Sequence, residues 1–286
     1  MDITLRKSYR FPVTTIGGRE FRWGSRTYVM GLVNLTPDSF SGDGLLANPR
    51  AALEQALRFE ADGADIIDVG AESTRPGHTP VSVDEELRRL LPTLEMLTSR
   101  VKLPISVDTY KAEVARRALE AGASMLNDIW GLKEGPGLAS LAAEHDVPIV
   151  IMHNQHGTEY RDLLPDIMSS LRASVEKARA VGVQERNIIL DPGIGFGKTP
   201  SQNVVVLRRL NELGVLGHPV LVGTSRKSLI GRVLDLPVDE RLEGTAATVA
   251  LSIAGGADIV RVHDVKAMVR VARMSDAIVR GWTESV

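Results

Sequence analysis

The sequence contains no cysteine and has no excess of charge of either sign. Without cysteine the chain can form neither disulfides nor cysteine metal sites, and it has no thiol nucleophile. Lysine and arginine number 34 against 36 acidic residues, so no overall basic field attracts nucleic acid or an anionic membrane. Any site that binds an anion must therefore be local.

Long apolar runs are also missing. No stretch approaches the roughly 18 apolar residues of a membrane span, and the opening MDITLRKSYRFPV has no apolar signal core. We therefore expect a cytoplasmic protein without membrane contact. The composition is that of a globular protein, 43% hydrophobic and 24% charged, and the 286 residues fit one α/β barrel or two ordinary domains.

Short β-rich apolar runs alternate with longer segments of helical period. The eight expected strands are 28–33, 64–69, 104–107, 123–126, 148–152, 187–190, 219–222 and 257–262. Expected helices include 49–62, 83–98, 111–121, 166–181, 201–213, 243–255 and 264–281. Three joints, ADGADIIDV, EAGASMLND and AGGADIVRV, place glycine at a helix end just before a buried strand, which supports this register.

This alternation favours a (β/α)8 TIM barrel over a doubly wound sheet. No glycine fingerprint for a dinucleotide follows the first strand, and no linker divides the chain. We expect residues 1–286 to form a single domain. Within it, residues 1–27 carry a Gly-Gly hairpin, VTTIGGREFRWG, that is expected to cap the bottom of the barrel.

Polar residues follow every expected strand, and TIM-barrel enzymes place their chemistry at these C-terminal strand ends. In chain order the ends carry Asn34, Glu72 to Arg75, Asp108 and Thr109, Asn127 and Asp128, His153 to Gln155, Asp191, Ser225 to Ser228, and Arg261 with His263. A single aspartate after a strand is most often a helix N-cap. Eight polar ends together favour one shared pocket instead.

The acidic members of this set are open to more than one interpretation. Asp108 and Asp191, with the amide of Asn127, could accept from the amino and ring N–H groups of a planar heterocycle. Paired carboxylates could also serve as general acid and base or as metal ligands, and spacing alone does not decide.

The basic members favour a phosphate or carboxylate ligand. They are Arg75, Arg226, Lys227, Arg261 and His263. The stretch IGFGK (194–198) adds glycines for close backbone approach and Phe196 as a stacking face.

Eight strings between residues 28 and 265 resemble, in order, the dihydropteroate synthase family. They are GLVNLTPDSFS, IIDVGAESTRPG, ISVDTYK, LNDIWG, IMH, LDPGIGFGK, GTSRKSLIG and IVRVHDV. The resemblance implies a TIM-barrel transferase of folate biosynthesis. It would condense 6-hydroxymethyl-7,8-dihydropterin pyrophosphate with p-aminobenzoate, releasing pyrophosphate and giving 7,8-dihydropteroate. Mg²⁺ as cofactor, small molecules as the only substrates, and a homodimer formed through the last helices are implied as well.

The resemblance also assigns roles to residues. The pterin pocket is assigned to Asp108, Asn127, Ile129, Met152, Asp191, Phe196 and Lys227. Pyrophosphate is assigned to Asn34, Arg261 and His263, with Mg²⁺ bridging Asn34 and the leaving group. For p-aminobenzoate the family implies Ser228 and the helix N-terminus after it, with Phe40, Thr74, Arg75 and Pro76 brought in by two closing loops.

The chain departs from the family pattern at two places. Residues 41–44 read Ser-Gly-Asp-Gly where the family usually has Ser-Asp-Gly-Gly, which bears on the role of Asp43, and Asn154 follows His153 where methionine is common. Two other functions remain open: a pterin-binding methyltransferase barrel that uses methyl-tetrahydrofolate, and a catalytically silent pterin-binding barrel. The methyltransferase would have less need for Arg261, His263 and the Ser-Arg-Lys-Ser loop to hold pyrophosphate, and the silent barrel is disfavoured because none of the polar positions is missing.

Overall fold

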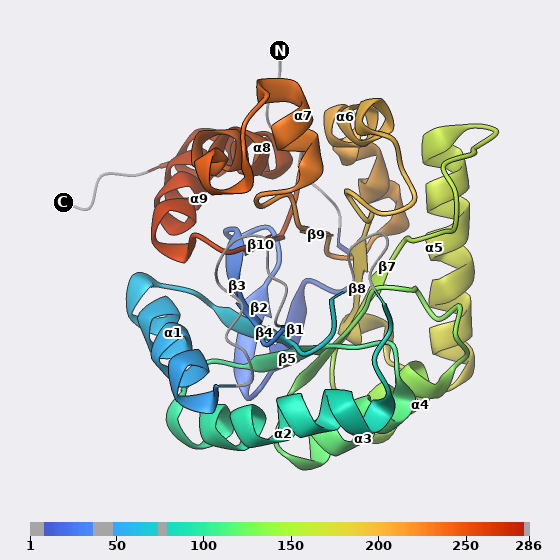
Figure 1. Ribbon diagram of the computed structural model, residues 1–286. Helices are drawn as coiled ribbons and strands as arrows, with labels where there is room; N and C mark the ends of the chain where they lie inside the picture. Colours follow the sequence, from blue (N-terminus) through green and yellow to red (C-terminus); the bar gives the residue numbers. More distant parts are fainter. Residues whose placement is uncertain (1–8, 37–47, 74–78, 283–286) are drawn as a thin grey trace.

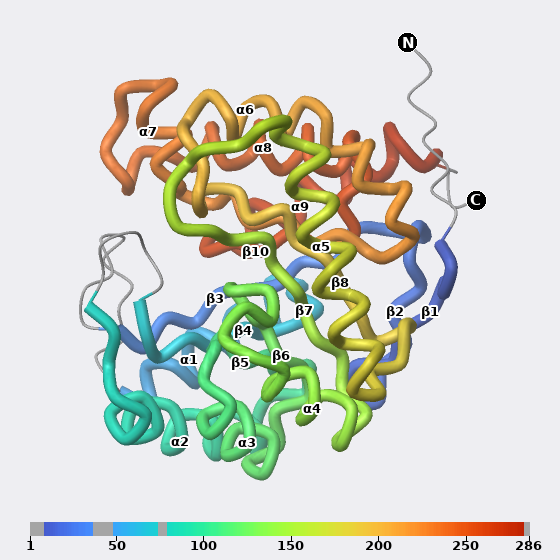
Figure 2. Tube along the Cα trace, turned by 90° about the vertical axis from the view of Figure 1, so that its right-hand side faces the viewer, coloured from blue at the N-terminus to red at the C-terminus, as the bar shows by residue number. Residues whose placement is uncertain are grey.

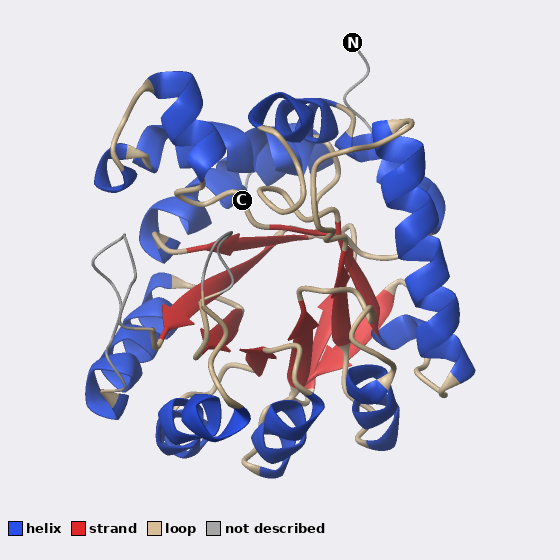
Figure 3. Cartoon of the chain, turned by 45° about the vertical axis from the view of Figure 1, so that its right-hand side comes forward, coloured by secondary structure: helices blue, strands red, loops and turns tan. Residues whose placement is uncertain are grey.

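A computed structural model describes residues 9–36, 48–73 and 79–282 of the chain. Eight parallel strands form its centre, and the helices surround them (Figures 1 and 3). The strands are β3 (Tyr28–Asn34), β4 (Ile66–Gly70), β5 (Ile105–Asp108), β6 (Met125–Asp128), β7 (Ile149–Met152), β8 (Ile188–Asp191), β9 (Leu221–Val222) and β10 (Ile259–Val262). A parallel bridge between Leu190 and Val220 joins the edge strands β8 and β9, so the sheet closes into a barrel. The predicted (β/α)8 fold is confirmed.

Helices follow the strands along the chain and cover the outside of the barrel. They are α1 (Pro49–Asp62), α2 (Val83–Arg100), α3 (Ala112–Glu120), α4 (Gly137–Glu144), α5 (Leu163–Ala180), α6 (Pro200–Arg208), α7 (Ser228–Leu234), α8 (Leu242–Ala254) and α9 (Val265–Arg280). Local signals fix several of the starts. Asn48 caps α1 with Pro49 following it, and Thr199 forms a capping box with Gln202 at α6. No helix in the described part of the chain is long and apolar enough to cross a membrane.

The sequence periodicity predicts the strands to within about two residues but does not predict α4. This helix, Gly137–Glu144, is mostly small and apolar, and its Leu138, Ala139 and Ala142 are buried. Because it has few polar residues to mark an outer face, it lacks the amphipathic pattern by which the other helices are recognised. Residues 201–213, predicted as one helix, are divided between α6 and a 3-10 segment, Leu210–Leu216.

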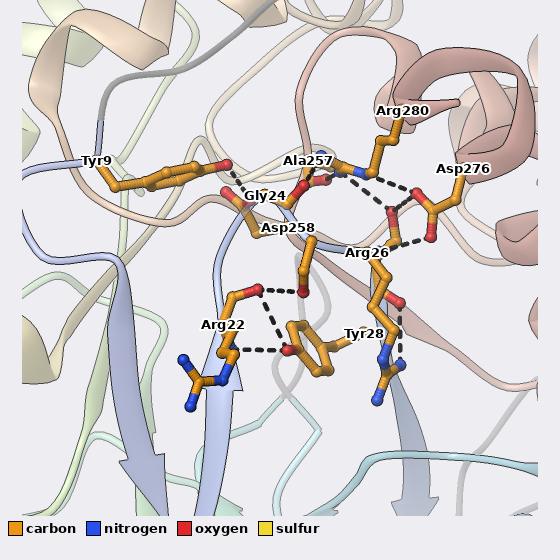
Figure 4. A network of polar contacts seen from close by, with 11 residues as sticks. Tyr9, Arg22, Gly24, Arg26, Tyr28, Ala257, Asp258, Asp276 and Arg280 are labelled. Atoms are coloured by element: carbon orange, nitrogen blue, oxygen red, sulfur yellow. Dashed lines mark hydrogen bonds and ion pairs between the residues drawn. The ribbon is translucent and has the colours of Figure 1, made fainter. Parts of the chain in front are cut away.

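The N-terminal hairpin closes the bottom of the barrel. Its strands, β1 (Val13–Ile16) and β2 (Arg19–Arg22), pair antiparallel at the edge of the molecule seen in Figure 2. Ile16, Phe21 and Trp23 join one apolar cluster with residues from inside the barrel. Polar contacts tie the same end together, among them Tyr9 donating to Asp258 and Arg280 donating to Asp276 (Figure 4). This end is therefore packed shut.

Strand register aligns the polar residues at the opposite end, the mouth. Gly70 at the end of β4 pairs with Asn34 on one side and with Asp108 on the other. Asp108 pairs in turn with Asn127 of β6, and Met152 pairs with Asp191. Residues paired across parallel strands point to the same face of a sheet. One layer of the barrel therefore carries the polar residues that the sequence places at the strand ends.

Candidate active site

A pocket of about 620 Å³ opens at the mouth of the barrel. Its lining comes from β3, β5 and β10, from the loops after β3, β4, β8, β9 and β10, from the start of α7, and from the segment before α8. The lining residues are Leu32, Asn34, Thr36, Glu72, Ser73, Asp108, Gly195, Phe196, Ser225, Arg226, Lys227, Ser228, Val238, Arg241, Arg261 and His263. Seven of them carry predicted roles: Asn34, Asp108, Phe196, Lys227, Ser228, Arg261 and His263. The structure thus brings together residues that are up to 229 positions apart in the sequence, from Asn34 to His263.

Four predicted pterin residues are not among the residues that line this pocket. Asn127, Ile129, Met152 and Asp191 are all buried. Register nevertheless places Asn127 beside Asp108, and Met152 beside Asp191. Asn127 therefore shares a layer of the barrel with Asp108, and Met152 shares one with Asp191. The remaining predicted residues, Phe40, Thr74, Arg75 and Pro76, lie outside the described residues, as does Asp43.

Arg261 connects the two ends of the pocket. Its Nη2 donates to Asp108 Oδ2 at 2.7 Å, and its Nε donates to Asp68 Oδ2 at 2.7 Å. The sequence assigned Arg261 to pyrophosphate and Asp108 to the pterin, and it did not indicate that the two residues pair. In the structure the two residues form a direct ion pair, so a change at either affects both ends of the pocket.

Burial sets the charge states on the pocket floor. Burial raises the pKa of Asp108 to about 7. The positive charge of Arg261 opposes this shift, and the negative charge of Asp68 adds to it by a smaller amount. Burial also raises the pKa of Asp191, against Lys227 and the Gly193 N–H, and lowers the pKa of Lys227 to about 8. Asp108 and Lys227 therefore titrate near neutrality, which is typical of functional sites.

The loop after β8 forms one wall of the pocket. Gly193, Gly195 and Gly197 all have positive φ, and a Cβ on Gly193 would overlap the carbonyl oxygen of His153. Only glycine lets the backbone pass this closely. The loop presents the ring of Phe196, and the ammonium of Lys227 lies 4.5 Å from its centroid. An aromatic face with a cation beside it can hold a flat heterocycle.

A buried lysine holds this loop from behind. Lys198 Nζ donates to the carbonyl oxygens of Gly193 and Phe196, each at 3.0 Å, and lies 3.0 Å from Nδ1 of His153. Burial lowers the pKa of Lys198 to about 7 and, with the neighbouring lysines, lowers that of His153 to about 3. His153 is therefore neutral at physiological pH. Sequence analysis assigned no role to this pair, although both residues stand in the quoted strings.

The three residues predicted to bind pyrophosphate, Asn34, Arg261 and His263, all line the pocket. His263 is half-buried, and its Nδ1 lies 2.9 Å from Ser225 Oγ, which orients the ring. Arg226, counted by sequence among the mouth cations, has its guanidinium paired with Asp264 through Nε and Nη2. Its positive charge is therefore largely neutralised by Asp264, although the side chain lines the pocket.

The outer wall includes residues that sequence analysis missed. Arg241 donates to the carbonyl oxygens of Leu236 and Arg226, and its side chain lines the pocket. The Arg241 guanidinium lies so close to Gly231 of α7 that a Cβ at this position would overlap it. A glycine inside a helix is therefore the sequence signal that could have pointed to Arg241. Glu72, which the sequence already places among the polar strand ends, also lines the pocket and forms an ion pair with the half-buried Lys111.

Comparisons with known proteins agree with this geometry. Residues 30–263 match the family described as pterin binding enzyme. The dihydropteroate synthase of Bacillus subtilis is 57% identical over 253 residues, which are 88% of this chain and 89% of that protein. The crystal structure of the Clostridium difficile dihydropteroate synthase in the presence of pteroic acid is 52% identical, has a TM-score of 0.86, and aligns over 90% of this chain and 98% of that one. The Xanthomonas albilineans dihydropteroate synthase with 4-aminobenzoic acid is 41% identical, with a TM-score of 0.87, over 94% and 98% of the two chains.

Proposed function

The chain belongs to the dihydropteroate synthases of the pterin-binding enzyme family, and from that premise we propose how its own residues carry out the reaction. The reaction condenses a dihydropterin pyrophosphate with p-aminobenzoate and releases pyrophosphate. Relatives and solved structures alike carry the name of this enzyme, which favours it over the methyltransferase alternative.

The pterin is proposed to lie between Phe196 and the acidic floor. Asp108, Asp191 and Asn127 offer two carboxylates and an amide at neighbouring heights of the barrel, which suit the amino and ring N–H donors of a pterin. Lys227 stands beside Phe196, with Ile129 and Met152 as apolar neighbours of the floor. Acidic groups here would also stabilise positive charge that develops on the pterin as the leaving group departs.

Pyrophosphate is proposed to bind at Asn34, Arg261 and His263. Among the described residues no group of three or more His, Asp or Glu side chains is arranged to hold a metal. Mg²⁺ does not need such a group, because it commonly keeps waters and takes one or two protein oxygens together with substrate phosphates. The amide oxygen of Asn34, at the end of β3 in the pocket lining, fits that requirement. When bound there, Mg²⁺ would neutralise charge on the leaving group.

Departure of pyrophosphate then needs little from the protein beyond charge. Arg261 and His263 offer N–H donors to its oxygens, and the electron-rich pterin shares the charge left on its exocyclic carbon. The weakly basic aromatic amine attacks that carbon, and the acidic adduct then loses its extra N–H proton to water, so no strong general base is required. The proposed order is leaving-group departure first and amine attack second.

The second substrate is proposed to enter from the outer wall. Ser228 places a hydroxyl there for the p-aminobenzoate carboxylate, with Arg241 and Val238 in the same lining. Phe40, Thr74, Arg75 and Pro76 are proposed to complete this subsite, on the family resemblance alone, since they lie outside the described residues.

A cytoplasmic homodimer remains part of the proposal. Met274 and Ile278 lie four residues apart on α9 and are each 62% exposed, and Leu251 of the neighbouring α8 is 67% exposed. Residues spaced by four share a helix face. Large apolar side chains gathered on two packed helices support an interface formed through the last helices, as the resemblance implies.

One observation carries the mechanism: Asp108 and Arg261 meet in the pocket between a heterocycle wall and an anion end. The test is pyrophosphate release from dihydropterin pyrophosphate, measured with and without p-aminobenzoate. We expect release that depends on both substrates and on Mg²⁺. Pterin binding without any release would instead show a silent binding barrel.

A further inference from the structure

Asp68 is a buried carboxylate to which neither the sequence motifs nor the proposed mechanism gives a role. It lies in β4, paired with Leu32 and Ser106, two residues before the end of the strand. Its exposure is 0%, so it is not part of the pocket surface but lies below it. Gly70, the next residue of β4 on the same face, is the partner of Asp108. Asp68 therefore stands one layer beneath the pterin carboxylate.

The contacts of Asp68 are directed at one side chain. Its Oδ2 accepts from Nε of Arg261 and also lies 2.7 Å from Nη2 of the same guanidinium. Nη2 reaches Asp108 Oδ2 at the same distance. A guanidinium is a rigid planar fork, so two carboxylates acting on its Nε and Nη2 edge fix the orientation of the plane.

The position of Asp68 is costly for the fold. Placing a carboxylate in a barrel interior requires full compensation. Here Oδ1 of Asp68 is buried without a hydrogen-bond partner among the described residues, as is Oδ1 of Asp108. An apolar side chain of similar size would remove this cost. Local rules are broken in this way mainly at functional sites.

We propose that Asp68 is a positioning residue, whose carboxylate holds the Arg261 guanidinium in a single orientation where the pterin and pyrophosphate ends of the pocket meet. The inference rests on the proposed function, because it takes Arg261 as a ligand of the leaving group. Without Asp68, Arg261 keeps its ion pair with Asp108 but loses the contact to Nε that sets its tilt. Leaving-group recognition is then impaired while the pocket walls stay in place.

A second consequence follows from charge. Asp68 places a negative charge beside Asp108, where Glu86 of α2 and Asp128 of β6 also act against ionisation and Arg261 of β10 favours it. Lys227, from the loop before α7, faces the same floor. Removing the charge of Asp68 therefore lowers the pKa of Asp108. This shift would report that the Asp68 carboxylate lies close to Asp108, while the loss of kcat/KM reports its effect on Arg261.

The experiment compares Asp68→Asn with the wild type. We expect kcat/KM for the dihydropterin pyrophosphate to fall about tenfold to a hundredfold, the usual effect of losing a hydrogen bond between charged groups. We also expect a change in the acid limb, the fall in pteroic acid affinity at low pH, measured without Mg²⁺ or pyrophosphate. In the variant this fall should begin at a lower pH than in the wild type. Unchanged kinetics together with an unchanged acid limb would overturn the proposal.

The matched control is Asp258→Asn at the sealed end of the barrel. Asp258 is as fully buried as Asp68 and accepts from Tyr9 (Figure 4). It also accepts from the Val220 N–H. This variant should lower the melting temperature without changing kcat/KM or the acid limb. If it reproduces the kinetic losses of Asp68→Asn, those losses come from general destabilisation and the proposal fails.

Arg261→Lys keeps the test decisive even if Asp68→Asn does not fold. Lysine retains the charge but has no second donor corresponding to Nε, so it cannot keep the tilt that Asp68 imposes. Full activity of Arg261→Lys would refute the proposal. Where both variants fold, the double variant should lose much less kcat/KM than the product of the two single fold-losses. Absence of pyrophosphate release by the wild type would refute the proposed function itself, whatever the variants do.

Discussion

The titration of Asp108 gives the most direct test of the pocket floor. In the Asp108→Asn variant the pterin loses a charged acceptor, which is worth about 1.5 to 3 kcal/mol, or about ten- to a hundredfold in affinity. This loss should be complete only where the wild-type residue is ionised. Because the pKa of Asp108 is raised to about 7, the difference between the proteins should depend on pH.

The expected dependence has a definite sign and slope. A protonated carboxyl group has lost acceptor capacity, so wild-type affinity for pteroic acid should fall about tenfold per pH unit below the pKa. Asparagine does not titrate, so the ratio between the proteins should be largest at about pH 8 and about tenfold smaller at about pH 6. Calorimetric titration over that range measures it. A ratio that stays constant with pH would show that Asp108 is not the titrating acceptor.

The same pKa shift predicts the effect on stability. The pKa of Asp108 rises from its ordinary value of 3.8 to about 7 on folding, so the native protein holds a proton that the unfolded chain has already lost. Stability should therefore decrease as pH rises from about 4 to about 7 and then level off. Asp108→Asn removes this cost. Its melting temperature at about pH 8 should equal or exceed that of the wild type, and a marked decrease would contradict the burial argument.

Three further results are expected. Gly193→Ala should destabilise the fold by more than about 1 kcal/mol in chemical denaturation, whereas Gly18→Ala, also at positive φ but with open space around it, should cost less; equal costs would rule out the clash with His153. His263→Ala should weaken pyrophosphate inhibition alone, whereas Arg261→Ala should also alter pteroic acid binding, because Arg261 contacts Asp108; identical profiles would refute this division. p-Aminobenzoate should bind measurably only after Mg²⁺, pyrophosphate and a nonreactive pterin are present, and it should tighten their binding by the same factor; equal affinity for the free enzyme would exclude ordered binding.

Much of the barrel could be predicted from sequence because its signals are local. Apolar runs such as PIVIM, and the glycine that ends a helix before the next strand, depend on neighbouring residues only. The set of residues at the mouth could be predicted for a related reason, since every strand end in such a barrel faces the same side. Helix α4 could not, because its sequence has no polar face.

Pairings across the barrel were beyond the reach of the sequence. Nothing near Arg261 in the chain indicates that its guanidinium meets Asp108, 153 positions away, or that Arg226 is paired with Asp264. In the sequence Asp68 is one polar residue within a strand. Its contact with Arg261 becomes apparent only in the curved sheet, where β4 and β10 lie on opposite sides of β3. Long-range contacts of this kind depend on closure of the barrel, which a local pattern does not encode.

The sealed bottom of the barrel determines how substrates enter and how the product leaves. With Phe21 and Trp23 packed beneath the strands, the described chain offers the pterin ring a single way in and out. On the proposed assignment the ring sits deepest and the aromatic amine joins it from above. The product must then withdraw its pterin end last, past the outer wall that held the benzoate. Turnover should therefore be limited by exit rather than bond formation, and a burst of pyrophosphate in the first cycle would reveal it.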